Sequence, residues 1–220
     1  MINCTVVNPS STSPLRVLCL GAHSDDLEIG CGGTILKLAK GDTPLHVTWI
    51  VFSANEERRR EATDSANVFL TRADKIEVLV KDFRDGFFPY IGGQIKEYFE
   101  ALKTRMSPDL ILTHYRHDLH QDHRLISDLT WNTFRDHLIL EYEIPKYDGD
   151  LGSPNVFVHL DEAICRRKVA SIIDCFKSQA ENRWFCEEAF LSLMRLRGIE
   201  SNAPSGYGEA FYSRKMVLQS

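Results

Sequence analysis

The residues of this chain that are best suited to chemistry lie in a short cluster near its N-terminus. His23, Asp25 and Asp26 directly follow the apolar run of residues 17–20, which has the composition of a buried strand. In open α/β sheets, ligands bind at the carboxyl ends of the parallel strands. A histidine and two carboxylates at that place would be costly to bury unless they bound a cation. The spacing therefore predicts that His23 and Asp26 ligate a divalent metal ion and that Asp25 stays free to handle a proton.

A second cluster, formed by His120, Asp122 and His123, follows another strand-like segment at residues 109–113. Neighbouring parallel strands end at the same edge of a sheet, so His123 is expected to be the third ligand. Two histidines and one carboxylate with open positions are typical of a catalytic metal site. On a first helical turn, His120 would face the same cleft and stabilise a developing oxyanion. Asp122 would then hold the His120 imidazole in one tautomer.

Alternating strand-like and helix-like segments predict the elements that position both clusters. Their period indicates an α/β protein with a doubly wound, mostly parallel sheet. The part of the chain after residue 145 is expected to roof the site. We expect one domain over residues 1–220, with a loose N-terminal tail over residues 1–14. Strands are predicted over residues 16–20, 46–52, 75–80, 109–113, 138–143, 156–160 and 211–218, and helices over residues 34–40, 56–70, 94–106, 121–134 and 161–176.

The composition is that of a globular protein with no obvious macromolecular partner. Of the 220 residues, 43% are hydrophobic and 26% are charged, which is ordinary for such a protein. The formal net charge of −5 argues against nucleic-acid binding. No apolar stretch approaches the roughly 18 residues of a membrane span, and the N-terminus does not resemble a signal peptide. The six cysteines form no CxxC pair, which is typical of a reduced, cytoplasmic protein; a homo-oligomer is compatible with these data.

Several of these residues have other interpretations. Asp25 or Asp26 could cap a helix that begins near Gly30, although capping accounts for only one of them. His114 and His117 are expected to be strand-end or loop residues without a ligand role. Residues 27–33, Leu-Glu-Ile-Gly-Cys-Gly-Gly, resemble the loop with which methyltransferases bind S-adenosylmethionine. That interpretation would require a buried strand to continue through the preceding polar residues.

The chain resembles the PIG-L/LmbE-like family of metal-dependent deacetylases. The family signature Ala-His-Pro-Asp-Asp corresponds to Ala-His-Ser-Asp-Asp at residues 22–26. A second signature, Asp-x-His-Pro-Asp-His, corresponds to Asp-Leu-His-Gln-Asp-His at residues 118–123. Ser24 and Gln121 replace the two prolines, which ligate nothing but restrict the backbone. Weaker similarities follow in the family's order at residues 32–34, 58–62, 85–86, 178–179 and 209–211.

This resemblance implies a Rossmann-like three-layer α/β sandwich and an N-deacetylase. The substrate would be an N-acetylated amino sugar of the N-acetylglucosamine type, linked to a nucleotide, a lipid or a glycan. The resemblance implies that His23, Asp26 and His123 bind Zn²⁺, with Fe²⁺ as an alternative cation. It also implies that Asp25 is the general base and that His120, oriented by Asp122, stabilises the tetrahedral intermediate. A non-catalytic carbohydrate-binding relative would have lost one of these residues, and all are present here.

Fewer residues point to the rest of the substrate. Arg58 matches a position that contacts substrate in the family, and Asp118 is expected to bind substrate as well. Arg84 with Arg58 would suit a phosphate or carboxylate group, so a nucleotide-linked or otherwise anionic amino sugar is a hypothesis. The aromatic residues of segment 82–90 would either stack on the substrate or belong to the core.

Overall fold

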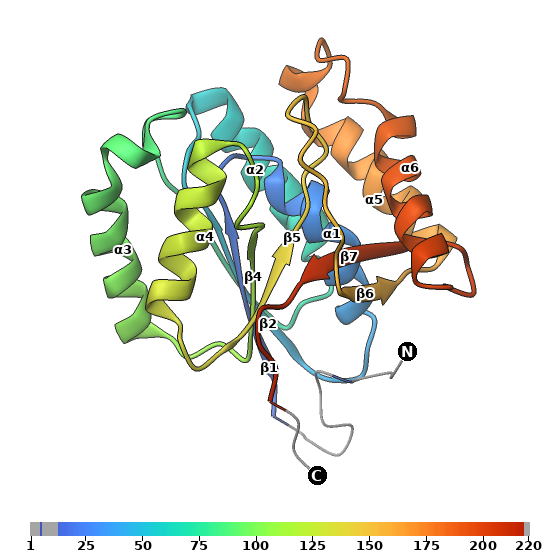
Figure 1. Cartoon of the computed structure of the whole chain (residues 1–220), viewed down its shortest axis with the longest axis horizontal. Helices are drawn as coiled ribbons and strands as arrows, with labels where there is room; N and C mark the ends of the chain where they lie inside the picture. The colour runs from blue at the N-terminus through green and yellow to red at the C-terminus, as the bar shows by residue number, and fades with distance from the viewer. Residues whose placement is uncertain (1–4, 6–12, 218–220) are drawn as a thin grey trace.

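The computed structural model describes residue 5 and residues 13–217 of the chain. Its middle layer is a seven-stranded sheet in the order β3-β2-β1-β4-β5-β7-β6, and helices cover both faces of that sheet (Figure 1). The strands are β1 (Leu15–Gly21), β2 (Leu45–Val51), β3 (Lys75–Val80), β4 (Leu110–His114), β5 (Leu138–Tyr142), β6 (Val156–His159) and β7 (Gly208–Tyr212). The helices are α1 (Asp26–Leu38), α2 (Glu56–Phe69), α3 (Gly92–Arg105), α4 (Gln121–Thr133), α5 (Glu162–Cys175) and α6 (Glu187–Glu200), with short 3-10 helices η1 (Phe88–Tyr90) and η2 (Lys177–Gln179).

The sheet is mostly parallel, which confirms the predicted fold class. Strands β1 to β5 pair in parallel, whereas β7 runs antiparallel to both β5 and β6. Strands β1 and β4 are neighbours, with Cys19 opposite Leu112. Their carboxyl ends therefore lie at one edge of the sheet, and the loops that follow them bring the two polar clusters together.

The two faces of the sheet are covered by different sets of helices. Helices α1, α2, α5 and α6 pack on one another on one side, and α3 and α4 pack together on the other. Successive β1 residues point into opposite core layers: Val17 and Cys19 into one, Leu18 and Leu20 into the other. A strand that is buried on both faces reads as a continuous apolar run, which is why β1 is recognisable in the sequence.

Helix α1 begins earlier than predicted, at Asp26 instead of residue 34. Glycines at positions 30, 32 and 33 lower the helix propensity of this segment. Their role is close packing: a Cβ atom on Gly30 would lie 2.2 Å from the Tyr142 ring, and one on Gly32 would lie 2.5 Å from Phe69. The glycine run therefore belongs to a helix interior and does not form a cofactor-binding loop at the end of a strand, as the methyltransferase interpretation requires.

Other differences concern the C-terminal third and the termini. Helix α6 was not predicted, because its apolar residues do not form one clear stripe. The last strand is β7 at Gly208–Tyr212, not residues 211–218, and residues 218–220 are outside the described part of the chain. Most of the predicted tail over residues 1–14 also lies outside it. Within the described residues, no helix has the length and apolar character needed to cross a membrane.

Candidate metal centre and active site

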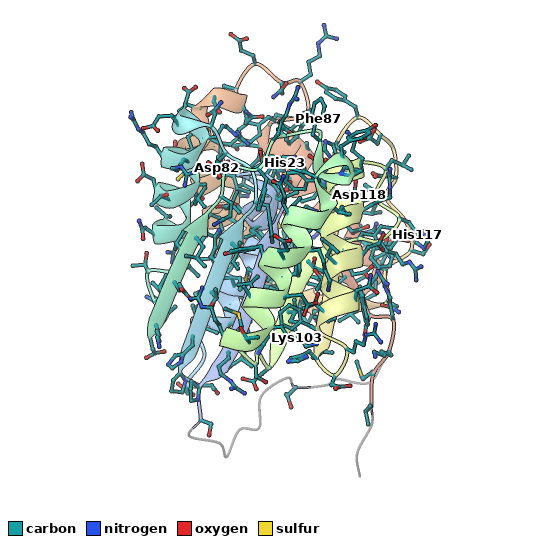
Figure 2. The ribbon with its side chains drawn as sticks, turned by 90° about the vertical axis from the view of Figure 1, so that its left-hand side faces the viewer. His23, Asp82, Phe87, Lys103, His117 and Asp118 are labelled. Carbon is teal, nitrogen blue, oxygen red and sulfur yellow. The ribbon has the colours of Figure 1, made fainter. Side chains whose placement is uncertain are left out.

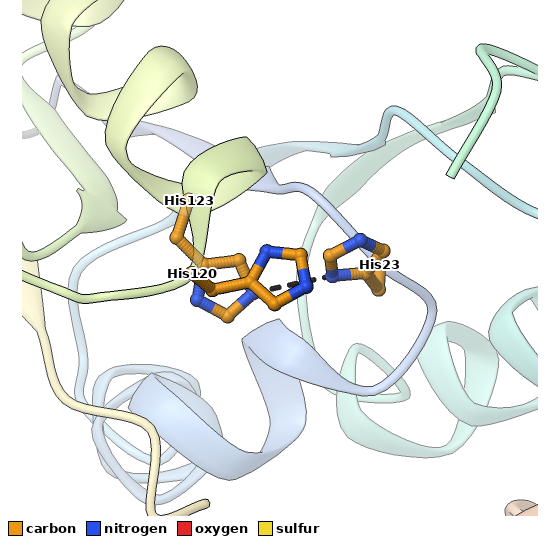
Figure 3. Close-up of side chains that lie close together, drawn as sticks. All are labelled: His23, His120 and His123. Atoms are coloured by element: carbon orange, nitrogen blue, oxygen red, sulfur yellow. Dashed lines mark hydrogen bonds between the residues drawn. The ribbon is translucent and has the colours of Figure 1, made fainter. Parts of the chain in front are cut away.

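Three of the predicted residues converge at the carboxyl edge of the sheet. His23 follows β1, Asp26 is the first residue of α1, and His123 lies in the first turn of α4. His23 Nδ1 lies 3.1 Å from His123 Nε2 and 3.4 Å from Asp26 Oδ2. His123 Nε2 lies 3.5 Å from Asp26 Oδ1. Figure 3 shows the His23 and His123 rings with the facing nitrogen atoms joined by a dashed line.

These separations fit a bound divalent cation. Zinc ligands lie about 2.0–2.2 Å from the metal in a tetrahedral arrangement, so their donor atoms are separated by roughly 3.4 Å. The three measured separations fall on either side of that value. The same cluster offers further donor combinations whose ligand atoms lie within 4.8 Å of one another: His23, His120 and His123; Asp26, His114 and His123; and His23, Asp85 and Asp122.

A buried carboxylate fixes the tautomer of His123. Its Nδ1 atom lies 2.9 Å from Asp118 Oδ2. Because a carboxylate only accepts hydrogen bonds, Nδ1 carries the proton and the Nε2 lone pair faces the cluster. Burial and the nearby His114 ring lower the pKa of His123 to about 3, so this imidazole is neutral at neutral pH. Lys146 Nζ lies 3.0 Å from Asp118 and neutralises its charge.

The surroundings of His23 favour a positive charge. Its Nε2 atom lies 3.0 Å from Asp85 Oδ1 and 3.4 Å from Asp122 Oδ2, which leaves Nδ1 directed at Asp26 and His123. Burial opposes the charge, but the hydrogen bonds to the three aspartates raise the pKa of His23 well above its ordinary value.

Asp25 lies beside the candidate metal ligands, and its side chain forms a hydrogen bond with Arg58. It occupies the N-cap position of α1, but its side chain forms no cap hydrogen bond. The Arg58 guanidinium instead donates to Asp25 Oδ1 across 2.8 Å. Burial and the charge of Asp26 raise the pKa of Asp25, against the opposing effect of Arg58. A carboxylate with a raised pKa is a stronger base than an ordinary aspartate.

His120 and Asp122 lie at the site but do not interact as predicted. The Asp122 carboxylate accepts hydrogen bonds from the backbone N–H groups of Gly86 and Phe88, at 2.7 and 3.1 Å. It is the backbone N–H of Asp122 that donates to His120 Nδ1, across 3.3 Å. His120 therefore keeps its proton on Nε2. Burial, together with the charge of His23, lowers the pKa of His120, so the ring is a neutral hydrogen-bond donor.

His114 ends β4 and is a strand-end residue, as predicted. It also contacts residues of the candidate metal centre. Its ring is buried and stacks on His123 with centroids 3.9 Å apart. Its Nε2 atom accepts a hydrogen bond from the Ala22 backbone N–H across 2.9 Å and lies 3.2 Å from Asp26 Oδ2. The His114 ring thus contacts two candidate ligands, His123 and Asp26. The sequence gives no signal for this role because the histidine belongs to a strand and not to either motif.

A cavity of about 670 Å³ opens above these residues. His23, His120 and His123 form part of its lining, together with Arg58, and the C-terminal part of the chain contributes residues 146–148, 178, 179 and 184. Figure 2 shows His23 near one end of the molecule and Lys103, of helix α3, toward the other. The C-terminal part also supplies walls of the cavity. Helix α5 packs on α1 and α2, and α6 packs on α5 and β7.

Two predicted substrate-binding residues lie outside this cavity. Asp118 is buried behind His123 and is bonded to it, so it supports a candidate ligand instead of facing substrate. Arg84 is exposed and lies over the Phe87 ring, with 3.5 Å between the guanidinium carbon and the ring centroid. In the aromatic segment 82–90, Phe88 is part of the core, while Phe87 and Tyr90 are exposed and do not line the cavity. In the sequence, Asp85 belongs only to the weaker family similarity at residues 85–86, which assigns it no role, and no pattern identifies Lys146; the contacts of both residues depend on the folded loops.

Comparison with known proteins identifies similar sequences and folds. A family model described as "PIG-L: GlcNAc-PI de-N-acetylase" matches residues 18–134, more than half of the chain. A conserved protein from Thermus thermophilus is 21% identical with a TM-score of 0.73, covering 94% of this chain and 97% of its own. The N,N'-diacetylchitobiose deacetylase from Pyrococcus horikoshii is 20% identical with a TM-score of 0.65, covering 90% and 83%. The 4-carboxy-2-hydroxymuconate hydratase from Pseudomonas putida is 18% identical with a TM-score of 0.73, covering 94% and 98%. At these identities, the structural neighbours show a shared fold.

Proposed function

Because this chain belongs to the PIG-L family of GlcNAc-PI de-N-acetylases, we propose that it is a metal-dependent hydrolase that removes the N-acetyl group from an N-acetylated amino sugar. The observation that carries this proposal is the convergence of His23 Nδ1, Asp26 and His123 Nε2 within 3.1–3.5 Å of one another. The Pyrococcus deacetylase shares the fold and adds support. The Pseudomonas hydratase shares it too, so the fold alone does not define the reaction.

In this proposal, His23, Asp26 and His123 would hold Zn²⁺ or Fe²⁺. The cation supplies two things when bound: it polarises the amide carbonyl and lowers the pKa of water toward about 7. The donor set of two imidazoles and one carboxylate suits either metal.

The neighbouring side chains handle the protons and the developing charge. Asp25, whose pKa is raised by burial, accepts a proton from the attacking water. The Nε2–H group of His120 donates a hydrogen bond to the oxyanion of the tetrahedral intermediate. The amide C–N bond then breaks, and the proton taken by Asp25 passes to the departing amine nitrogen. The products are acetate and the free amino sugar.

Arg58 restrains the base in this scheme. Its guanidinium bonds Asp25 across 2.8 Å and Ser178 across 3.2 Å, and its second carboxylate neighbour is Glu61, at 3.6 Å. These contacts hold the Asp25 carboxylate at the wall of the cavity. We assign Arg58 to positioning the base as well as to contact with substrate.

A free-amine assay on N-acetylglucosamine and N,N'-diacetylchitobiose, together with elemental analysis, tests the proposal. We expect amine release that depends on about one equivalent of bound metal and is abolished by a chelator and restored by Zn²⁺ or Fe²⁺. Metal bound without amine release from any N-acetyl sugar would instead favour a non-catalytic carbohydrate-binding protein. S-adenosylmethionine binding without metal would favour a methyltransferase.

A further inference from the structure

The charge of the cavity constrains what the amino sugar is attached to. Five carboxylate side chains line the cavity, against two permanently cationic ones, Arg58 and Lys146. Three of the acids, Glu57, Asp85 and Asp148, are exposed and form its mouth. The lining therefore carries an excess of negative charge, and a bound divalent cation would not remove it completely.

Neither cationic side chain is free to bind an anionic group. Arg58 is bonded to Asp25 across 2.8 Å. Lys146 lies 3.0 Å from Asp118 and is also paired with Asp150. A phosphate that approached either one would have to break a buried or half-buried ion pair, and it would also pass the carboxylates of the mouth. The electrostatics thus disfavour a phosphorylated carrier.

Two aromatic residues line the cavity on segments that follow β5 and η2. The Tyr147 side chain is 72% exposed, so most of its ring is open to a ligand. Trp184 is half-buried and packs edge-on against Phe185 and Phe190, which fixes its ring. Amphipathic rings of this kind contact sugars through the apolar face of the pyranose while their polar atoms stay hydrated.

The size of the cavity leaves room beyond one sugar. Its volume of about 670 Å³ lies well within the range of about 300–1,000 Å³ for sites that hold drug-sized ligands. N-acetylglucosamine is smaller than such a ligand. With the acetyl group at the candidate metal centre, the space toward Tyr147 and Trp184 would receive the group attached to the sugar.

We propose, on the basis of the function proposed above, that the substrate is an uncharged saccharide. Its terminal N-acetylated sugar occupies the metal centre, and its next sugar contacts Tyr147 and Trp184. This is narrower than the proposed deacetylase function, and it excludes nucleoside diphosphate and phospholipid carriers as preferred substrates. It also replaces the hypothesis of an anionic substrate, since Arg84 lies outside the cavity and Arg58 is already paired.

Amine release by the metal-loaded, full-length protein from three probes tests this proposal. We expect kcat/KM for N,N'-diacetylchitobiose to exceed that for N-acetylglucosamine by at least tenfold, and UDP-N-acetylglucosamine to be the poorest of the three. Equal or faster cleavage of UDP-N-acetylglucosamine relative to the disaccharide would overturn the proposal while leaving the deacetylase function intact. Failure to cleave any of the three probes would overturn both.

Variants at Tyr147 and Trp184 test whether these two rings contact the second sugar. We expect Tyr147→Ala and Trp184→Ala to lower the disaccharide-to-monosaccharide ratio of kcat/KM at least fivefold, and Trp184→Phe to retain most of it. Tyr90→Ala is the matched control, because Tyr90 is 77% exposed and does not line the cavity; its ratio should equal that of the wild type. An unchanged ratio in both Tyr147→Ala and Trp184→Ala would contradict the proposed contact of these rings with the second sugar.

A charge reversal tests the electrostatic part of the proposal. We expect the double variant Glu57→Lys/Asp148→Lys to raise kcat/KM for UDP-N-acetylglucosamine at least fivefold, with a gain that shrinks at high salt because exposed charges are screened. An unchanged or lower value for the nucleotide sugar, at low salt, would contradict the assignment of these acids as the barrier to anionic carriers.

Discussion

The Asp118 carboxylate accepts the Nδ1 proton of His123 across 2.9 Å, and this contact decides which nitrogen of His123 faces the candidate metal centre. Asp118 is in turn held by Lys146, at 3.0 Å, and it accepts the backbone N–H of His120 across 2.8 Å. A carboxylate behind a metal-ligating histidine fixes the ring and raises its basicity. Asp118 thus connects the loop that follows β4 to the loop that follows β5.

The first prediction concerns metal affinity. Replacing Asp118 with alanine removes the acceptor for the His123 Nδ1 proton, so the ring is free to rotate and to change tautomer. We expect Asp118→Ala to weaken metal binding by about 10- to 100-fold, measured by competition with a chromogenic chelator. Asp128→Asn is the control, since Asp128 is an exposed acid on the same helix, α4. Equal metal affinities for Asp118→Ala and the wild type would show that Asp118 does not orient the ligand.

The second prediction separates the base from the ligands. Asp25 touches Arg58 and is not among the three converging donors. We expect Asp25→Asn to retain its metal and to lower kcat/KM by about 10²- to 10⁴-fold, the usual contribution of a general base. His23→Ala should lose both metal and activity. Elemental analysis of the purified variants, with the amine-release assay, distinguishes the two cases, and near-normal turnover by Asp25→Asn would rule out Asp25 as the base.

The sequence was sufficient to predict the sheet and the convergence of its loops. The β1 run reads as continuously apolar because it is buried on both faces, and the polar residues after β1 and β4 mark the sheet edge where ligands bind. Those two facts place His23 and His123 together without any tertiary information. The resemblance to a known family then supplied the roles expected of each residue.

The remaining features depend on contacts that local patterns do not encode. Helix α1 begins at Asp26 despite its glycines because Tyr142 and Phe69 pack where Cβ atoms would otherwise lie. The side chain of Asp122 turns to the amides of Gly86 and Phe88 instead of to His120, because the loop before η1 brings two free N–H groups to it. The partner of each of these side chains is therefore set by segments that are distant in the sequence and adjacent only in the fold.

The third prediction tests the close packing of α1. A Cβ atom at Gly30 would lie 2.2 Å from Cδ2 of the buried Tyr142 ring, whose hydroxyl donates to the Leu20 carbonyl. We expect Gly30→Ala to lower the free energy of unfolding by about 1–3 kcal/mol, as overpacked cores do. Gly93 on α3 is the matched control, because nothing lies within 4 Å of its Cβ position. Gly93→Ala should stabilise the protein by about 0.4–1 kcal/mol through a less flexible unfolded chain. Urea denaturation measures both, and equal effects of the two substitutions would contradict the packing argument.

The fourth prediction is a pH dependence of stability that originates in Glu28. This residue of α1 is fully buried, and the buried Ser65 hydroxyl is a polar neighbour of its carboxyl group. Burial raises the pKa of Glu28 from its ordinary 4.5 to about 8. The folded protein therefore binds this proton more tightly than the unfolded chain does. The stabilisation from the protonated carboxyl is fully present below the pKa that Glu28 has in the unfolded chain. It is lost as the pH rises through the pKa that Glu28 has in the folded protein.

The measurement is urea unfolding between pH 5 and pH 8.5 at constant saturating metal, comparing Glu28→Gln with the wild type. The amide keeps the shape of the neutral acid and cannot ionise, so it should remove a slope of at most about 1.4 kcal/mol per pH unit from the wild-type curve. Glu28→Gln should thus be close to wild type at pH 5 and more stable than wild type at pH 8.5. Glu97→Gln, at an exposed position of α3, should leave the wild-type slope unchanged. If Glu28→Gln keeps that slope as well, the buried carboxyl does not titrate in this range, and another group accounts for the pH dependence.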